Sequence, residues 1–87
     1  MARIEKKCWP EFFQAIVDGT KAFEIRLADV KYEPGDILVL REWDPLTEQH
    51  TGREIEKEIT YVIETRELKF WPKEETEKHG LVVLSLK

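Results

Sequence analysis

Residues 19–26 read Gly-Thr-Lys-Ala-Phe-Glu-Ile-Arg and join a predicted helix to a predicted strand. Phe23 and Ile25 alternate with two charged residues, and successive side chains of a strand point to opposite faces. We therefore expect the two apolar side chains to enter the core. Glu24 and Arg26 should then share the other face of the strand.

Lys21 lies just outside this alternation. If the strand begins at Ala22, the lysine belongs to the connection, and its side chain is free to turn toward Glu24 and Arg26. One acid and two bases would then converge where the helix meets the strand. The plainer interpretation is a surface salt bridge beside a solvated lysine, and such pairs contribute little to stability. The sequence leaves both interpretations open.

The residues before this stretch predict a strand and a helix. Arg3–Trp9 reads as a first strand with Ile4 and Cys8 pointing inward. Proline suits the first turn of a helix, and apolar residues at one-turn spacing predict a helix over Pro10–Asp18. The apolar stripe consists of Phe12, Phe13, Ile16 and Val17. Gly19 is expected to end the helix in a left-handed conformation.

The residues after it predict three more strands, which follow the strand Ala22–Arg26. They cover Ile37–Trp43, Arg53–Thr65 and Leu81–Leu86. The loop Asp44–Gly52 reads as an exposed hairpin connection. Lys57 interrupts an apolar face formed by Ile55, Ile59, Tyr61 and Ile63, which predicts a bulge or an edge position there. Lys73–His79 is expected to form one or two helical turns, whereas Arg66–Lys73 has no assigned structure.

Composition restricts the class of protein. With 87 residues the chain has room for one domain and one core. No apolar run approaches membrane-spanning length and no segment resembles a signal peptide, so we expect a cytoplasmic protein. A net charge of −4 argues against strong non-specific binding to a phosphate backbone. The 37% of charged residues are mostly Glu and Lys, as in thermophile proteins.

One cysteine cannot form an internal disulfide, and too few Cys and His residues surround it for a zinc site. We therefore expect no metal and no cofactor. Cys8 is expected to pack in the core, and Trp9 to cap the first strand against the helix. His50 and His79 are expected at the surface, and Trp71 fits a lid or a core position.

The stretch quoted first resembles the Gly-x-Lys-x-x-Glu-x-Arg signature of the ASCH domain (activating signal cointegrator homology), a branch of the PUA-like superfamily of small β-barrels. Three further blocks resemble one subfamily: Cys-Trp-Pro-Glu-Phe-Phe, Pro-Gly-Asp-Ile-Leu-Val-Leu-Arg-Glu-Trp-Asp-Pro and Thr-Gly-Arg-Glu-Ile. The resemblance runs from about Cys8 to the last strand. It implies a single α+β domain over residues 1–87, a small PUA-like β-barrel of about five mixed strands with two short helices. Short strands separated by turns also favour a small barrel.

The resemblance further implies a cleft beside the first helix and the next strand, lined by Lys21, Glu24 and Arg26. PUA-like domains commonly bind RNA, so the implied function is an RNA- or nucleotide-binding module. Unpaired bases are read by stacking on aromatic rings or arginine planes and by hydrogen bonds to their edges. Trp43, Arg41 and Arg26 could supply planes, while Glu24 could accept from an amino group. Trp43 could equally be buried in the barrel mouth.

The alternative is a small amidohydrolase. Some ASCH proteins with a similar signature act on acylated cytidine-type nucleosides, and their lysine is thought to activate a nearby threonine. Here Lys21 is present, but the residue three positions on is Glu24, and Thr20 lies on the wrong side of Lys21. A Lys21–Glu24 pair could still transfer a proton to or from water if burial lowered the pKa of the lysine. Binding therefore ranks before catalysis.

A third class is a protein-interaction domain. The acidic surface and the exposed Asp44–Gly52 loop are compatible with it, although no motif specifies it. We expect a monomer or a weak dimer.

Overall fold

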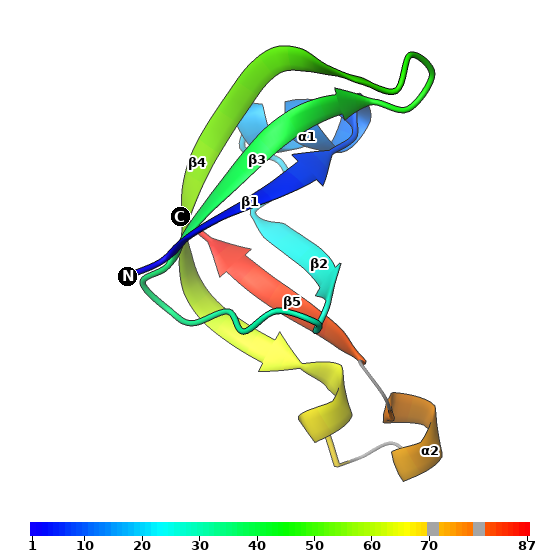
Figure 1. Ribbon diagram of the computed structural model, residues 1–87. Coiled ribbons are helices and arrows are strands. Elements are labelled where there is room, and N and C mark those ends of the chain that lie inside the picture. The colour runs from blue at the N-terminus through cyan, green and yellow to red at the C-terminus, as the bar shows by residue number, and fades with distance from the viewer. Residues whose placement is uncertain (70–71, 78–79) are drawn as a thin grey trace.

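The computed structural model describes residues 1–69, 72–77 and 80–87 (Figure 1). In this part of the chain the strands are β1 (Arg3–Cys8), β2 (Phe23–Leu27), β3 (Ile37–Asp44), β4 (Gln49–Glu64) and β5 (Leu81–Leu86). The helices are α1 (Pro10–Val17), the 3-10 turn η1 (Thr65–Glu67) and the single turn α2 (Lys73–Thr76). The predicted α+β class with five mixed strands is confirmed. None of the helices in the described part is long and apolar enough to cross a membrane.

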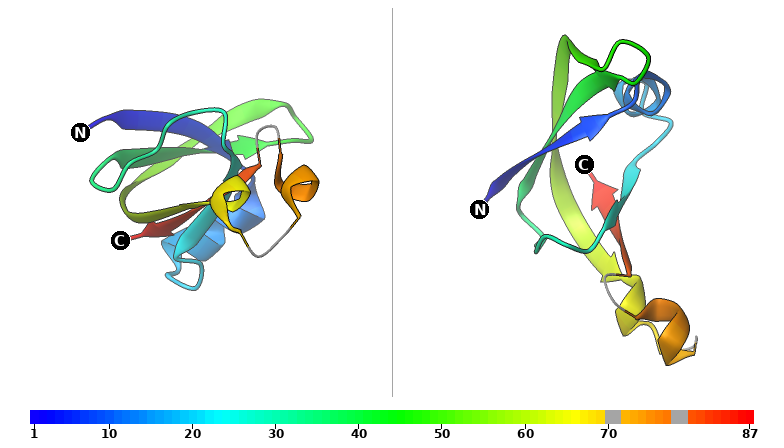
Figure 2. Two further views of the ribbon diagram at one scale, coloured as in Figure 1. Left: turned by 90° about the horizontal axis from the view of Figure 1, so that it is seen from below. Right: turned by 45° about the vertical axis from the view of Figure 1, so that its right-hand side comes forward.

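The strands form one sheet in the order β1-β3-β4-β5-β2. β1 runs parallel to β3, and the other neighbours are antiparallel. β4 bends along its length, so that its first half pairs with β3 and its second half with β5 (Figures 1 and 2). β1 and β2 stand at the two ends of this order. No ladder joins them within the described residues, and the sheet is therefore open.

The predicted and the observed boundaries of the elements differ most at the β3–β4 hairpin and in the region before β5. β4 begins at Gln49, so the predicted loop Asp44–Gly52 shrinks to a turn at residues 45–48. The helical turns predicted after residue 72 are present as Lys73–Thr76. The predictions for Trp71 and His79 lie outside the described residues.

Of the two alternatives predicted at Lys57, a bulge or an edge position, the bulge was wrong. β4 does have a strand partner on one side only at Lys57, because its ladder with β5 begins at Ile59. Lys57 pairs with Leu38 in regular register, and the register shift comes later, between Ile59 and Tyr61. An extra residue in one strand reverses which side chains face inward. Ile59 therefore lies in the core, whereas Tyr61 and Ile63, predicted on the same face, point outward.

The core lies between the inner face of the sheet and α1. Its buried members are Cys8, Phe13, Ile16, Tyr32, Leu38, Leu40, Ile59, Val82 and Leu84. Only half of the predicted helical stripe belongs to it, because Phe12 and Val17 are about half exposed. Gly19 follows the helix with φ +82°, the left-handed conformation that was predicted.

Strand β2 has its inner and outer faces reversed relative to the prediction. Glu24 is only 5% exposed, whereas Phe23 and Ile25 are 45% and 54% exposed. The alternation itself is correct, but alternation does not say which face is buried. β2 is an edge strand whose inner face meets charged partners. These partners offset the cost of burying a carboxylate.

Replacing Phe13 with Ala should lower the free energy of unfolding by about 3–5 kcal/mol, because its ring is 1% exposed and its loss leaves a cavity. Phe12 is the matched control on the same helix, 47% exposed. Phe12→Ala should cost less than half as much. Urea unfolding of both variants measures the difference. Equal losses, or a loss under about 1 kcal/mol for Phe13→Ala, would contradict this placement of the helix.

Candidate functional site

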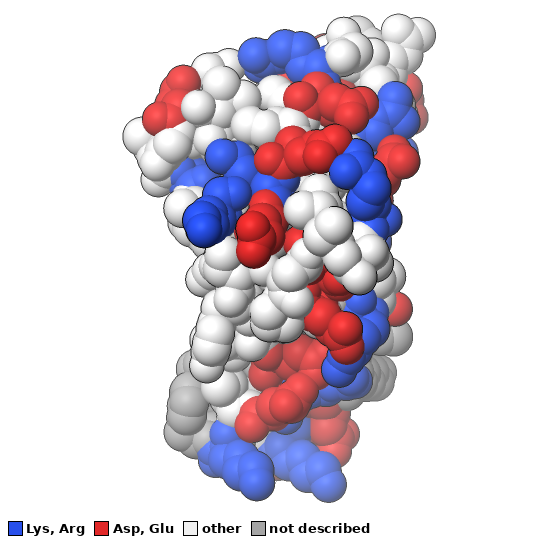
Figure 3. Space-filling model, turned by 90° about the vertical axis from the view of Figure 1, so that its left-hand side faces the viewer, with Lys and Arg blue, Asp and Glu red and all other residues white. Residues whose placement is uncertain are grey.

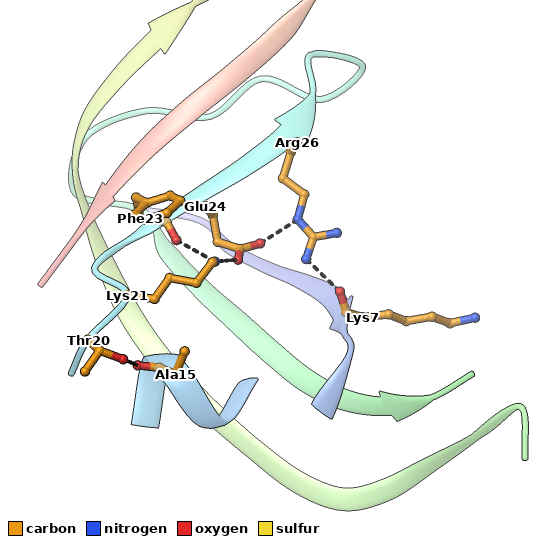
Figure 4. A network of polar contacts seen from close by, with 7 residues as sticks. All are labelled: Lys7, Ala15, Thr20, Lys21, Phe23, Glu24 and Arg26. Carbon is orange, nitrogen blue, oxygen red and sulfur yellow. Dashed lines mark hydrogen bonds and ion pairs between the residues drawn. The ribbon is translucent and has the colours of Figure 1, made fainter. Parts of the chain in front are cut away.

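Lys21, Glu24 and Arg26 form one connected cluster of charges (Figure 4). Lys21 Nζ donates to Glu24 Oε1 at 2.5 Å, and Arg26 Nε donates to Glu24 Oε2 at 2.9 Å. Each oxygen of the carboxylate therefore accepts from a different cation. The predicted convergence of one acid and two bases is confirmed, and the burial of Glu24 distinguishes the cluster from an exposed surface pair.

The end of α1 fixes the position of Lys21. The backbone N–H groups of Thr20 and Lys21 both donate to Ala15 O, at 3.0 and 3.1 Å, which folds the chain back after the helix. Lys21 Nζ also donates to Phe23 O at 2.7 Å. The hydroxyl of Thr20 donates to Ala15 O at 3.1 Å and so points toward the helix end (Figure 4). Thr20 is therefore engaged away from the charged cluster.

Arg26 links the two edges of the open sheet. Its Nη2 donates to Lys7 O at 2.6 Å, which ties β2 to the end of β1 by a side chain where no strand ladder runs. A pocket of about 710 Å³ opens at this seam, and we call it the seam pocket. It is lined by Lys7, Cys8, Trp9, Phe12, Lys21, Phe23, Glu24, Ile25, Arg26 and Trp43.

Aromatic side chains form much of the wall. Trp9 was predicted in the core but is about half exposed, so that prediction was wrong. Trp9 is the residue before the first turn of α1 and has an extended backbone, with φ −65° and ψ 150°. Its side chain therefore leaves the core at the helix start. Phe12 and Phe23 are also about half exposed at the pocket.

Trp43 is half-buried and takes part in two contacts. Lys7 Nζ lies 3.8 Å from the centre of its ring, a cation–π contact, and the His50 ring meets it edge-on at 5.0 Å. His50 is exposed, as predicted. Lys7 was missed as a site residue because its position depends on the pairing of β1 with β3. No signal in the sequence reveals that pairing.

Arg41 does not join the other predicted site residues. It faces outward from β3, where its Nη1 lies 3.8 Å from Glu5 Oε1. It is not among the described residues that line the seam pocket. Lys21, Glu24, Arg26 and Trp43 do line it.

Cys8 lines the pocket and is nevertheless buried, as predicted for a core residue. Burial raises the pKa of its thiol from 9.0 to about 11, and the negative charge of Glu24 adds to this shift. Lys21 and Arg26 oppose it more weakly. The group is thus a neutral thiol near pH 7, whereas the thiolate is the nucleophilic form of cysteine.

A second buried acid, Glu42, was not predicted as such. Its Oε1 accepts from Thr51 Oγ1 at 2.6 Å and from Arg53 Nε at 3.0 Å, and its Oε2 accepts from Arg53 Nη2 at 3.0 Å. Arg53 Nη2 also donates to Gln14 Oε1 of α1 at 3.0 Å. The hydrogen bonds from Arg53 and Thr51 lower the pKa of Glu42 below its ordinary value. Glu42 therefore clamps the β3–β4 hairpin to α1. In the part of the chain that is described, no three His, Cys, Asp or Glu residues are grouped to hold a metal ion.

Fold and site together define a class: a small α+β protein with an open mixed sheet and a charged, aromatic-walled pocket between its edge strands. Residues 5–86 match the model of a domain of unknown function, DUF3850, and the chain belongs to that family. It is also similar to an uncharacterised 12.9 kDa protein in the GpA 3′ region of Escherichia phage P2. The two are 41% identical over 63 residues, 71% of this chain and 56% of the phage protein. The chain thus spans little more than half of that relative.

Glu42→Gln should lower Tm near pH 7 by about 4–8 °C, the shift expected for a loss of about 1 kcal/mol in a domain of this size. Because folding lowers the pKa of Glu42, its stabilisation is present above the ordinary pKa of 4.5 and is lost as pH falls through the lowered value. The difference in Tm from the parent should therefore shrink below about pH 4. Glu5→Gln, at an exposed pair, is the control and should change Tm little. A difference that is independent of pH would contradict the clamp.

Proposed function

We propose that this protein is a binding module that holds a nucleotide, or the end of a single-stranded RNA, in the seam pocket. The observation that carries the proposal is a buried carboxylate held by two cations among aromatic walls. A nucleobase has flat faces that stack on aromatic rings and polar edges that form hydrogen bonds. The rings of Trp9 and Phe12 are available to stack on the faces of the base, and Glu24 to accept from one of its edges.

Glu24 keeps hydrogen-bonding capacity for a ligand. A carboxylate has about four acceptor sites, and the contacts with Lys21 and Arg26 use one on each oxygen. The remaining sites suit an amino group or a ring N–H, as when a carboxylate accepts from the amino group of cytosine. The two cations fix the carboxylate in place, so little ordering is needed when the ligand binds. A cytosine-type base, whose amino group can donate to Glu24, therefore fits the seam pocket.

The charges around the pocket favour an anionic ligand. Lys7, Lys21 and Arg26 line it together with a single acid, Glu24, although the whole chain carries a net charge of −4. This local excess of positive charge suits a phosphate group. Elsewhere, on the face shown in Figure 3, acidic and basic side chains alternate without one continuous basic surface. A long sequence-independent contact with a nucleic acid backbone is accordingly disfavoured.

We further propose that the open sheet belongs to the PUA-like barrels and that the family is a branch related to the ASCH domain. The curvature of β4 and the side-chain bridge between β1 and β2 support a barrel-like arrangement. The signature residues Lys21, Glu24 and Arg26 at the junction of helix and strand support the relationship. A nucleotide ligand would also suit a cytoplasmic protein.

Cytidine monophosphate should bind more tightly than uridine monophosphate. Cytosine presents an amino group to Glu24, whereas in uracil two carbonyl oxygens flank the one ring N–H and would face the carboxylate unfavourably. Glu24→Gln keeps the shape but loses the charge and half of the acceptor capacity. This variant should lose about 1–3 kcal/mol of binding to cytidine monophosphate and much less to uridine monophosphate. Binding of both parent and variant should weaken as salt rises. Calorimetric titration measures these affinities.

Because Glu24 is buried between two cations, Glu24→Gln is also expected to unfold more easily, and binding must be measured where the variant is fully folded. A variant that is less stable but binds both nucleotides as the parent does would assign Glu24 a structural role alone. Parent protein that binds neither nucleotide nor short RNA would reject the proposal.

An amidohydrolase remains the second candidate. The Lys21–Glu24 contact is its only support, because a lysine beside a carboxylate could move a proton. The nucleophile and the base that such a hydrolase needs are poorly provided. Thr20 donates to Ala15 O, Cys8 is a neutral thiol, and Lys21 already donates to Glu24 and to a backbone carbonyl. A lysine nitrogen that already donates to two acceptors is poorly placed to act as a base.

Incubation with an N4-acylated cytidine should therefore release no acid above the uncatalysed rate, as followed by chromatography. Lys21→Ala is the diagnostic variant, and Lys31→Ala, at an exposed lysine outside the seam pocket, is its matched control. Steady release by the parent and by Lys31→Ala, but not by Lys21→Ala, would reverse the order of the two candidate functions.

A further inference from the structure

Among the described residues that pair in β2, β5 and the second half of β4, every side chain on the outer face of the sheet is uncharged. Strand register places Phe23 beside Ser85, Ile25 beside Val83 and Leu27 beside Leu81. On the other side of β5, Tyr61 pairs with Ser85 and Ile63 with Val83. Residues in register share a face of the sheet. We call the set the outer apolar face: Phe23, Ile25, Leu27, Tyr61, Ile63, Leu81, Val83 and Ser85.

This face is unusual for a chain with 37% charged residues. Six of its large apolar side chains are between 38% and 61% exposed. On the inner face of the same β2 strand, Glu24 and Arg26 are buried or half-buried. The strand thus turns its charges inward and its apolar side chains toward solvent. Such a face is typical of a surface that another layer covers.

We propose that a second copy of this chain covers the outer apolar face, in a symmetric dimer that packs sheet on sheet. A whole aromatic side chain offers about 150–250 Å² and an aliphatic one somewhat less, so the exposed parts sum to roughly 600 Å² per copy. Two copies would then bury roughly 1,200 Å², the low end of specific interfaces. The roughly 600 Å² of one copy lies at the upper end of the largest apolar patch on a typical monomer, and the total for two copies corresponds to a dimer of moderate affinity.

Charge favours a second copy over a different partner. Two chains of net charge −4 repel each other, so they can approach closely only where no charge lies. The strand side chains of the outer apolar face carry no charge, and at its margin Lys21 Nζ lies 4.9 Å from the centre of the Phe23 ring. In a two-fold arrangement the face packs against the same face of the second copy, which matches it in size and chemistry. Contact along it gives the sheet a covered layer on both sides.

The dimer does not depend on the proposed ligand. Phe23 and Ile25 contribute to both the face and the seam pocket, whereas Leu27 and Leu81 contribute only to the face. Leu27 and Leu81 pair in register and are 56% and 44% exposed. Changes at these two leucines therefore test the interface without altering the pocket lining.

Sedimentation equilibrium of the whole chain over a range of concentrations tests the proposal. The parent should associate to a dimer with Kd of about 1–100 µM, as expected for an interface of this size. The double variant Leu27→Lys, Leu81→Lys should weaken association at least ~100-fold, because each copy would place charges in an apolar contact. Leu46→Lys is the matched control, since Leu46 is 93% exposed at the hairpin tip and lies outside the face. It should dimerise as the parent does.

A parent that stays monomeric at all concentrations overturns the proposal, and so does a dimer that the double variant leaves intact. Ser85→Cys gives a second measurement that needs no charged substitution in the face. Cys8 is buried, so a maleimide reagent should label position 85 first. Labelling should slow as protein concentration rises through Kd. A labelling rate independent of concentration would contradict burial of this face.

Discussion

The bond from Arg26 to the backbone of Lys7 holds together a sheet that hydrogen-bonded strands leave open. β1 and β2 are the two edge strands, and an unpaired edge exposes backbone groups that need partners. Arg26 satisfies one of them at 2.6 Å and remains bonded to Glu24 through its Nε. A guanidinium can do both because its donors are arranged in a rigid planar fork. The pocket lies at this seam because the edge strands meet through side chains.

The buried acids Glu24 and Glu42 make similar contacts but have different roles. Glu24 and Glu42 each accept from an arginine and from one other donor, and each is about 5% exposed. Glu42 accepts from two of the three guanidinium nitrogens of Arg53 and from the Thr51 hydroxyl, which uses most of its acceptor sites. Glu24 has one partner on each oxygen and lines the seam pocket. The two acids are equally buried, so burial does not distinguish them. Glu24 is the acid that can bind a ligand, because it keeps free acceptor sites and lines a pocket.

The sequence predicted the elements well and their packing less well. Local signals such as the proline at the start of α1 and Gly19 after the helix were sufficient for the helix, and the charged cluster followed from spacing within a few residues. The faces of β2 were assigned the wrong way round, because alternation defines two faces without saying which one another layer covers. Trp9 and Arg41 were misplaced for a related reason. Their surroundings depend on strand pairing and on the path of the chain into α1, which are non-local properties.

The reversed faces of β2 connect the two proposals. Phe23 and Ile25 belong to the seam pocket and to the outer apolar face at once, because β2 is a single edge strand between them. An edge strand is held by one neighbour and shifts more easily than a central strand. A second copy packed on the outer face would restrain β2 and, through it, the backbone that carries Glu24 and Arg26. Restraint of a binding site before the ligand arrives reduces the ordering cost of binding. By linkage, a ligand that fixes β2 would favour the dimer to the same extent.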